Sequence, residues 1–268
     1  MRIATILLAL LCSIHFSCQK ELSVEISGSN STTPPAIPPT GGGKLVRIQQ
    51  GIDPDITMDT VLLISYDGSQ RITQIVDSLY TDTIKVTYDA STGRLAKARG
   101  RYSNVQYLFN SGGQLIEINY ANFGHTGKYT FEYTNGVLTK KNDYSDIGPG
   151  GSLQLWSYSI YTFNGENISR VITYHNNGSL FYQTDYTFGN HANSFKDLGL
   201  LNVSNTLGLD KLTDPDIYFC KNDFTKAVTD GITNITLYTY NSQQQPVKAT
   251  IEQSNPYPYL NTWMFQYK

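Results

Sequence analysis

One short pattern recurs eight times after residue 60: an aromatic strand, a turn rich in Asn, Asp or Gly, and an apolar strand. Each copy is centred on one aromatic residue, and these eight anchors are Tyr66, Tyr88, Phe109, Tyr133, Phe163, Phe188, Tyr240 and Tyr267. Neighbouring anchors are 21 to 30 residues apart, except for the 52 residues from Phe188 to Tyr240. A fixed period is typical of a repeat architecture. The long gap covers about two periods and predicts an insertion.

Alternating side chains within each repeat predict β-strands. In Lys128–Tyr133 the aromatic residues take one face, and in Leu115–Tyr120 the apolar residues do. Asn-Gly at 135–136 and 164–165 predicts tight hairpins, because both residue types accept a positive φ. With two strands per repeat, we expect roughly fourteen to seventeen strands in an all-β domain over residues 44–268. The predicted fold is an antiparallel up-and-down meander forming an open barrel or half-barrel, with a partly helical insertion near 190–231.

Two other β-architectures fit the pattern less well. A β-propeller blade needs four strands in about 40–45 residues, which is longer than the observed period. An outer-membrane barrel needs an apolar face toward lipid. Here the strand faces opposite the aromatic residues carry charges, and these residues are Lys85, Lys97, Arg99, Glu117 and Glu132. The charges favour a sheet that faces water on one side.

The N-terminal region predicts export and anchoring. Residues 1–17 have the composition of a signal peptide, with Arg2 followed by an apolar run that is too short to span a bilayer. Cys18 follows Ser17, and the segment resembles the lipobox of bacterial lipoproteins, which implies acylation of Cys18. Gln19 resembles the residue found there in lipoproteins sent to the outer membrane. Residues 18–43 are rich in Pro, Gly, Ser and Thr and are expected to form a linker. The alternative is a soluble secreted chain.

The repeats also resemble a known family. Tyr88-Asp89 followed by Gly93-Arg94-Leu95 matches the YD (Rhs-type) repeat, and Tyr66-Asp67 with Arg71-Ile72 matches it in part. The whole layout is similar to a group of uncharacterised Gram-negative lipoproteins with a porin-like β-domain. In that group an insertion carries elements like 193–195 and 220–223 of this chain. The resemblance implies a fold and a place at the envelope, and it implies no activity or catalytic residue.

Composition and motifs exclude several function classes. A formal net charge of −2 with no basic run predicts no nucleic-acid partner. After processing, Cys220 is the one cysteine expected to remain free, and it is expected to be buried. The three remaining histidines have no ligand spacing, so neither a metal nor another cofactor is expected. No catalytic residue is predicted, although two carboxylates placed across a groove would revive a hydrolase.

The aromatic residues are the one indication of a ligand. The densest group of rings is Trp156, Tyr158, Tyr161, Tyr182 and Tyr186. On a curved sheet these rings would line a trough suited to sugars or apolar molecules, or they would form the core beneath the insertion. The sequence therefore predicts a non-enzymatic lipoprotein, held at the outer membrane by its lipid, that acts as a binding or scaffolding module for a glycan, another small molecule or a protein partner.

Overall fold

The computed structural model describes residues 43–51, 59–78, 81–122, 124–146, 151–203, 215–254 and 259–268. These residues belong to one compact unit, Pro38–Lys268. The predictions for the signal peptide, Cys18 and the linker up to residue 42 lie outside the described residues. In the described part, no helix has the length and apolar character needed to cross a membrane.

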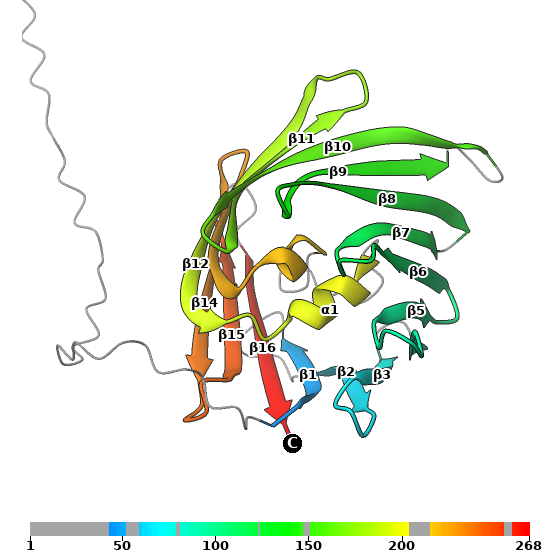
Figure 1. Cartoon of the computed structure of the whole chain (residues 1–268). Coiled ribbons are helices and arrows are strands. Elements are labelled where there is room, and N and C mark those ends of the chain that lie inside the picture. Colours follow the sequence, from blue (N-terminus) through cyan, green and yellow to red (C-terminus); the bar gives the residue numbers. More distant parts are fainter. Residues whose placement is uncertain are drawn as a thin grey trace, which may run out of the picture. The chain divides into compact units, whose positions relative to one another are not determined.

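Sixteen antiparallel strands form a closed barrel (Figure 1). The strands are β1 Leu45–Gly51, β2 Asp59–Tyr66, β3 Ile72–Asp77, β4 Asp82–Tyr88, β5 Leu95–Arg99, β6 Ser103–Phe109, β7 Leu115–Asn122, β8 His125–Thr134, β9 Val137–Asp146, β10 Leu153–Asn164, β11 Asn167–His175, β12 Leu180–Ala192, β13 Asn222–Thr229, β14 Ile232–Tyr240, β15 Pro246–Gln253 and β16 Tyr259–Tyr267. Each strand pairs with the next along the chain, and β16 pairs with β1 from Leu45↔Tyr267 to Gly51↔Thr262. The predicted meander is confirmed. The barrel closes fully, whereas the sequence predicted an open or half-open one, because hairpin patterns carry no signal for a pairing between the two ends of the domain.

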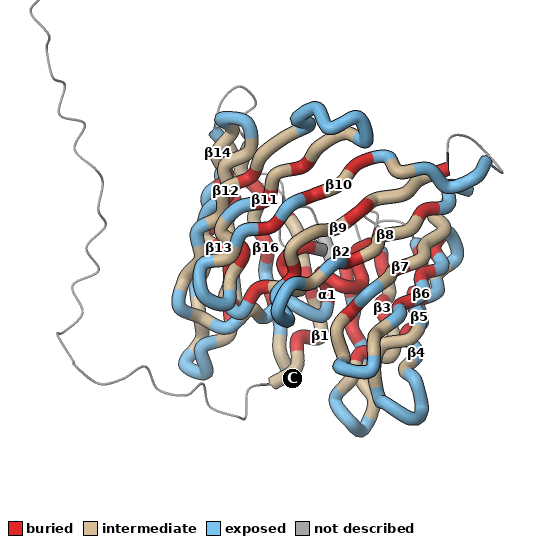
Figure 2. Tube along the Cα trace, turned by 45° about the horizontal axis from the view of Figure 1, so that its top comes forward, coloured by how far each residue is buried: buried red, intermediate tan, exposed pale blue. Residues whose placement is uncertain are grey.

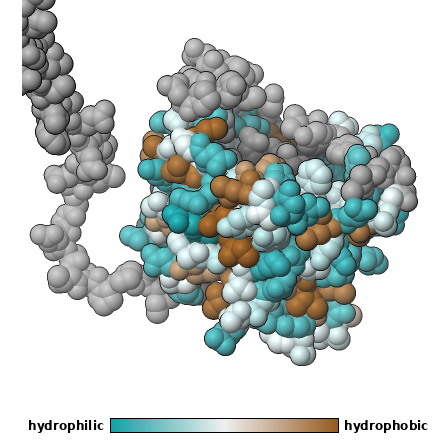
Figure 3. Space-filling model, turned by 90° about the horizontal axis from the view of Figure 1, so that it is seen from above, coloured by the Kyte–Doolittle hydropathy of each residue, from teal (hydrophilic) through white to brown (hydrophobic). Residues whose placement is uncertain are grey.

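Alternation along the strands separates the core from the surface (Figure 2). On β4, Ile84 and Val86 are buried inside the barrel, while Thr83, Lys85 and Thr87 are exposed outside it. A fully buried aliphatic side chain contributes about 1.5–3 kcal/mol. The pattern therefore fixes the register, because a slip of one residue would expose the whole inner set. Hydrophilic and hydrophobic residues are interspersed over the face seen in Figure 3.

The insertion fills the barrel with two short helices, α1 Lys196–Leu201 and the 3₁₀ helix η3 Pro215–Phe219 (Figure 1). We call the described residues 193–203 and 215–221 the plug. Its Leu198, Leu201, Val203 and Ile217 are buried in the common core. The hydroxyl of Tyr107 on β6 donates to the carbonyl of Leu200 at 2.9 Å. Packing and hydrogen bonds thus attach the plug to the barrel wall.

The partly helical insertion near 190–231 is confirmed, with one correction. Residues 222–228 fall within the predicted insertion, but they belong to strand β13. The ladder between β12 and β13 shifts register: Thr187 pairs with Lys226, and Phe188 pairs with Phe224. The extra residue, Thr225, is a β-bulge that interrupts the alternation of side chains, and this interruption hid the strand in the sequence.

The repeat anchors coincide with register shifts. Seven of the eight anchors directly follow a shift in the ladder to the next strand, and they are Tyr66, Tyr88, Phe109, Tyr133, Phe163, Phe188 and Tyr240. In four of these ladders the extra residue is Thr or Ser, and its hydroxyl donates to the carbonyl just before the anchor; the four are Thr73, Thr139, Ser169 and Thr225, at 3.2–3.3 Å. Each bulge thus supplies a hydroxyl for a carbonyl at the disrupted point of the ladder.

The turns after four of the anchors, Tyr66, Tyr88, Phe109 and Tyr240, share one chemistry. The side chain of Asp67 accepts hydrogen bonds from the backbone N–H groups of Ser69 and Arg71, both at 2.9 Å. Asp89, Asn110 and Asn241 cap their own turns in the same way. Three or four residues later the backbone takes a positive φ, at Gln70, Gly93, Gly113 and Gln244. Glycine suits this position because it has no Cβ to clash there.

Consecutive hairpins are joined by the anchors themselves. The hydroxyl of Tyr88 donates to the carbonyl of Ile72 in the preceding repeat at 2.9 Å. Tyr66 donates to Leu45 and Tyr133 to Leu115 in the same manner. The residue before each of these acceptors is polar; Lys44 lies over the ring of Tyr66, and Arg71 lies over the ring of Tyr88. Side chains therefore connect neighbouring hairpins in addition to the backbone ladder.

The positive-φ positions predict opposite effects of matched substitutions. Gly93→Ala is expected to lower the free energy of unfolding by about 1 kcal/mol, because φ is +68° and the added Cβ meets nothing closer than 3.7 Å. Gly113→Ala should cost more, because its Cβ would lie 2.7 Å from the Arg94 guanidinium. Gln70→Gly should raise stability by about 0.5–1 kcal/mol, because it relieves a φ of +64°. Urea unfolding measures all three.

Gly68→Ala is the control, since Gly68 has no positive φ and its Cβ would contact nothing within 4 Å. It should be neutral or slightly stabilising. Equal losses at Gly68 and Gly93 would contradict this account of the turns.

Candidate functional site

The repeat turns gather at one end of the barrel, which we call the mouth. The turns β2–β3, β4–β5, β6–β7, β8–β9, β10–β11 and β14–β15 lie there, as an up-and-down topology requires. The first and last described residues meet there as well, because the N–H of Lys44 donates to the carbonyl of Lys268 at 2.7 Å. The plug enters and leaves at this end, where the N–H of Asn193 donates to the carbonyl of Lys221 at 2.8 Å.

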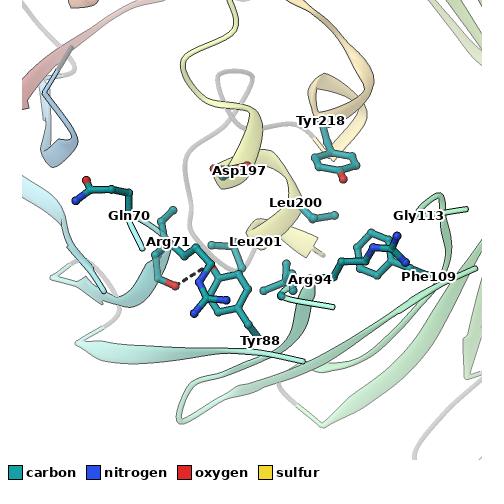
Figure 4. A pocket seen from close by; sticks show the side chains of 13 residues that line it. Gln70, Arg71, Tyr88, Arg94, Phe109, Gly113, Asp197, Leu200, Leu201 and Tyr218 are labelled. Atoms are coloured by element: carbon teal, nitrogen blue, oxygen red, sulfur yellow. Dashed lines mark hydrogen bonds between the residues drawn. The ribbon is translucent and has the colours of Figure 1, made fainter. Parts of the chain in front are cut away.

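A cavity of about 310 Å³ opens at the mouth between the barrel wall and the plug (Figure 4). Its lining residues are Gln70, Arg71, Ile72, Tyr88, Gly93, Arg94, Leu95, Phe109, Gly113, Asp197, Leu200, Leu201 and Tyr218. We call this cavity the mouth pocket. Its volume lies within the range of about 300–1,000 Å³ of small-molecule sites.

Two arginines and two aromatic anchors form the wall of the mouth pocket. The Arg71 guanidinium lies over the ring of Tyr88, 4.5 Å from its centroid, and contacts Asp67 at 2.8 Å. The Arg94 guanidinium lies over Phe109 at 6.0 Å. Its Nη1 donates to the carbonyl of Asn110 at 3.0 Å. The rings and turn groups therefore hold both cations in fixed orientations at the edge of the pocket.

The plug supplies the other side of the pocket. Leu200 and Leu201 are buried, Asp197 in the first turn of α1 is exposed, and Tyr218 comes from η3. Burial, and then the Asp197 carboxylate, raise the pKa of Tyr88 to about 12 and also raise the pKa of Tyr218. Both phenols are therefore neutral at physiological pH, and each keeps a hydroxyl hydrogen. The pocket thus combines cations, one carboxylate, neutral hydroxyls and apolar surface.

Two further hollows flank the plug at the mouth. One, of about 190 Å³, lies beside Tyr66 and Tyr267 and shares Asp197 with the mouth pocket. Another, of about 460 Å³, lies beside Tyr133 and Phe163 and is bordered by Lys196. Each hollow lies between repeat anchors and the plug, so all three arise where the regular wall meets the irregular insertion.

The structure separates the five aromatic residues predicted from the sequence. Tyr161 is buried, and its hydroxyl donates to Asp216 of η3 at 2.7 Å. Tyr186 packs against the core. Trp156 is 53% exposed, and Tyr158 stacks on Tyr174 with ring centroids 5.2 Å apart.

Tyr182, the fifth of these residues, contacts the exposed ring of Phe181, with centroids 5.2 Å apart. Thus Tyr161 fastens the plug while Trp156 lies at the surface, and none of the five rings lines the three hollows described at the mouth. Ligand binding by these residues stays a prediction.

Sequence reasoning did not select the residues of the mouth pocket. Arg71 and Arg94 occupy the same repeat position, and the repeat pattern included that position only as a structural element. The available signal was an arginine that recurs at the end of a repeat turn, one repeat before an aromatic anchor on which it lies. Asp197 and Tyr218 lie in the insertion, which has no period from which their position could be read.

One buried carboxylate ties the plug to the wall near the mouth. Asp223 on β13 accepts a hydrogen bond from the N–H of Ser194 and another from the hydroxyl of Tyr240, both at 3.1 Å. Burial raises the pKa of Asp223 to about 7, and the two hydrogen bonds only partly offset this effect. Ser194 directly precedes the N-cap of α1, so Asp223 fixes the start of the plug helix.

Among the described residues, no group of three or more His, Cys, Asp and Glu side chains is placed to hold a metal ion. Asp197 is the one carboxylate among the described residues that line the mouth pocket. The polar groups of the pocket are therefore suited to hydrogen bonding and ion pairing with a small ligand.

Comparison with known proteins identifies the fold and no family. No protein-family model matches the chain, and no curated protein matches it. A porin-like protein from Bacteroides uniformis superposes with a TM-score of 0.56 at 14% identity, over 84% of this chain and 98% of that one. A porin-like protein from Bacteroides vulgatus gives 0.43 at 11% identity, over 84% and 99%. A TcdB2–TccC3–Cdc42 complex gives 0.30 at 13% identity, over 80% of this chain and 11% of that one. The first likeness supports a shared barrel fold.

The raised pKa of Asp223 predicts how stability depends on pH. The folded state holds this proton up to about pH 7, whereas an ordinary Asp loses it near 3.8. The contribution of Asp223 to the free energy of unfolding is therefore greatest below pH 3.8 and is lost as pH rises through 7. Asp223→Asn is expected to remove this loss and to be more stable than the parent at pH 8. Urea unfolding between pH 4.5 and 8.5 measures the difference.

Asp185→Asn is the control of opposite sign. The hydrogen bond from Arg170 lowers the pKa of Asp185 below 3.8, so its contribution is lost only as pH falls below that value, and between pH 4.5 and 8.5 the profile of Asp185→Asn should run parallel to that of the parent. The effect should be small because the side chain is 42% exposed. A parent and an Asp223→Asn variant with parallel stability profiles would contradict the role given to Asp223.

Proposed function

We propose that this protein is an envelope-associated binding module that holds a small polar ligand in the mouth pocket. The observation that carries the proposal is the pairing of fixed arginines and aromatic rings on the wall with Asp197 and Tyr218 on the plug. Such a site, with a few convergent polar groups on an apolar frame, is typical of small-molecule binding. The porin-like fold supports a place at the cell envelope.

The filled lumen supports binding rather than conduction. A barrel of sixteen strands is wide enough to leave an aqueous channel if side chains alone occupy it. In the described part of this barrel, α1 and η3 lie inside the wall, and Leu198, Val203 and Ile217 pack into the core. Lys141 on β9 also contacts Asp216 of η3 at 2.8 Å. These contacts hold the plug in place and give the pocket a rigid inner side.

The outer wall supports a barrel that stands in water. Lys85, Lys97, Arg99 and Lys226 are exposed on the outside of their strands. A lysine or arginine at mid-depth in lipid costs about 2–4 kcal/mol. We therefore propose that the predicted lipid on Cys18, rather than the barrel wall, attaches the protein to the membrane.

Scaffolding is a second candidate function, and one observation favours it. Exposed apolar side chains cluster where β10, β11 and β12 end far from the mouth: Leu180 is 60%, Trp156 53% and Phe181 45% exposed. The N–H of Asn176 in the β11–β12 turn donates to the carbonyl of Trp156, so Trp156 on β10 lies beside the turn that precedes Leu180 and Phe181. Large exposed rings are typical of contact surfaces.

The anchoring proposal predicts a specific N-terminus. Mass spectrometry of the membrane fraction should find a mature chain that begins at Cys18 and carries acyl groups. Cys18→Ser should release the protein into the soluble fraction, because several acyl chains supply the membrane affinity. An unmodified Cys18 in the mature protein would contradict the proposal.

The pocket proposal predicts that filling the cavity abolishes binding. A saccharide and metabolite panel is applied to the full chain, with ligand-induced thermal shifts and NMR line broadening as readouts. Asp197→Arg places a long side chain beside the cavity at an exposed position and should remove the response of any ligand that binds there.

Glu252→Arg makes the same change at an exposed position on β15, away from the residues that line the pocket, and should keep the response. A ligand that binds Asp197→Arg with unchanged affinity would place the site elsewhere. No response across the panel would favour scaffolding.

A further inference from the structure

The two arginines of the mouth pocket differ in one respect. Arg71 is neutralised within its own turn, since its Nη2 and Nε lie 2.8 and 2.9 Å from the Asp67 carboxylate. In the next repeat, Asp89 instead accepts hydrogen bonds from the hydroxyls of Ser91 and Thr92, at 2.6 and 2.8 Å. Arg94 thus forms no ion pair with any carboxylate in the described part of the chain.

The Arg94 guanidinium is held ready for a planar anion. One of its N–H groups donates to the carbonyl of Asn110, and its central carbon lies over the ring of Phe109, 6.0 Å from the centroid. A guanidinium has five N–H donors, so several remain available to a ligand. Gly113 keeps the space beside Nη2 free, because a Cβ there would lie 2.7 Å away. Orientation before binding lowers the entropic cost of pairing with an oxyanion.

The remaining lining suits a hydroxylated ring. Asp197 is exposed on the opposite wall and accepts hydrogen bonds, while the neutral hydroxyl of Tyr218 can donate or accept. Between these groups lie the apolar side chains of Leu95, Leu200 and Leu201. A ligand that fits has an oxyanion at one end and hydroxyl groups at the other.

We infer that the mouth pocket takes a small sugar acid, with its carboxylate paired to Arg94 and its hydroxyl groups directed to Asp197 and Tyr218. This inference rests on the proposed function and specifies its ligand class. Arginine and carboxylate form paired, charge-assisted hydrogen bonds, which are stronger than neutral ones. The same pocket should therefore prefer a sugar acid over the neutral sugar of the same shape.

Isothermal titration calorimetry of the full chain tests the preference, with D-galacturonate, D-galactose and inorganic phosphate as probes. Galacturonate is expected to bind at least about ten-fold tighter than galactose, the ratio expected of a charged hydrogen-bonded pair. Arg94→Gln should remove the preference, so that galacturonate and galactose bind with similar affinity. Arg94→Lys, which keeps the charge and loses the paired geometry, should retain only part of it.

Arg99→Gln is the matched control, since Arg99 is exposed on β5 outside the barrel and does not line the pocket. It should behave as the parent protein. If Arg94→Gln does not fold, Arg94→Lys carries the test alone, and an unchanged preference in that variant overturns the inference.

Three other outcomes also overturn the inference: equal affinity for galacturonate and galactose, phosphate bound as tightly as galacturonate, or a preference that survives Arg94→Gln. A different ligand of the panel that is blocked by Asp197→Arg would leave the proposed function standing and the ligand class wrong. Silence of the whole panel would defeat both.

Discussion

The barrel depends on an aromatic ring placed at a β-bulge beside each repeat turn. The bulge breaks the backbone ladder at the mouth, where the strands would otherwise continue their regular pairing. The hydroxyl of the anchor tyrosine instead forms a hydrogen bond with the preceding hairpin. Tyr88 donates to the carbonyl of Ile72, and Tyr133 donates to the carbonyl of Leu115. Phe109 lacks the hydroxyl, and there the cation of Arg94 over the ring provides the link. At the closing seam, Gln245 donates to the carbonyl of Gly43, so the last repeat is joined to the first.

Closure at sixteen strands explains why the period is interrupted. A ring of this size encloses more space than its inward side chains fill. The 52 residues from Phe188 to Tyr240 contain the plug and the strands β13 and β14. The longer spacing between these two anchors therefore supplies the residues that fill the barrel interior. Phe195, which packs against Phe265 with ring centroids 4.8 Å apart, begins this filling beside strand β16. The insertion is thus a structural requirement of the barrel as well as the source of one side of the pocket.

The sequence predicted the features that depend on neighbours along the chain. Alternation at Lys128–Tyr133, the Asn-Gly turn at 135–136 and the position of the insertion all follow from local residue preferences. Two features escaped prediction because they depend on distant contacts. The pairing of Leu45 with Tyr267 has no local signal, and the bulge at Thr225 shifts the alternation that would have revealed β13. The resemblance to YD repeats and to lipoproteins stays a prediction.

The difference between local residue preferences and distant contacts also explains why the sequence did not predict the candidate site. Arg71 and Arg94 each stand directly before the apolar residue that follows the turn. Asp67 pairs with Arg71, four residues later, whereas Asp89, five residues before Arg94, accepts hydrogen bonds from the hydroxyls of Ser91 and Thr92. Both aspartates are followed two residues later by a serine, but the second turn is one residue longer and adds the Thr92 hydroxyl to its aspartate. The repeats place similar residues around the whole mouth of the barrel. The plug distinguishes the position of Arg94 from the others, because Asp197 and Tyr218 line the same pocket. Specificity in such a barrel then depends on the insertion, which can vary without altering the ladder that closes the wall.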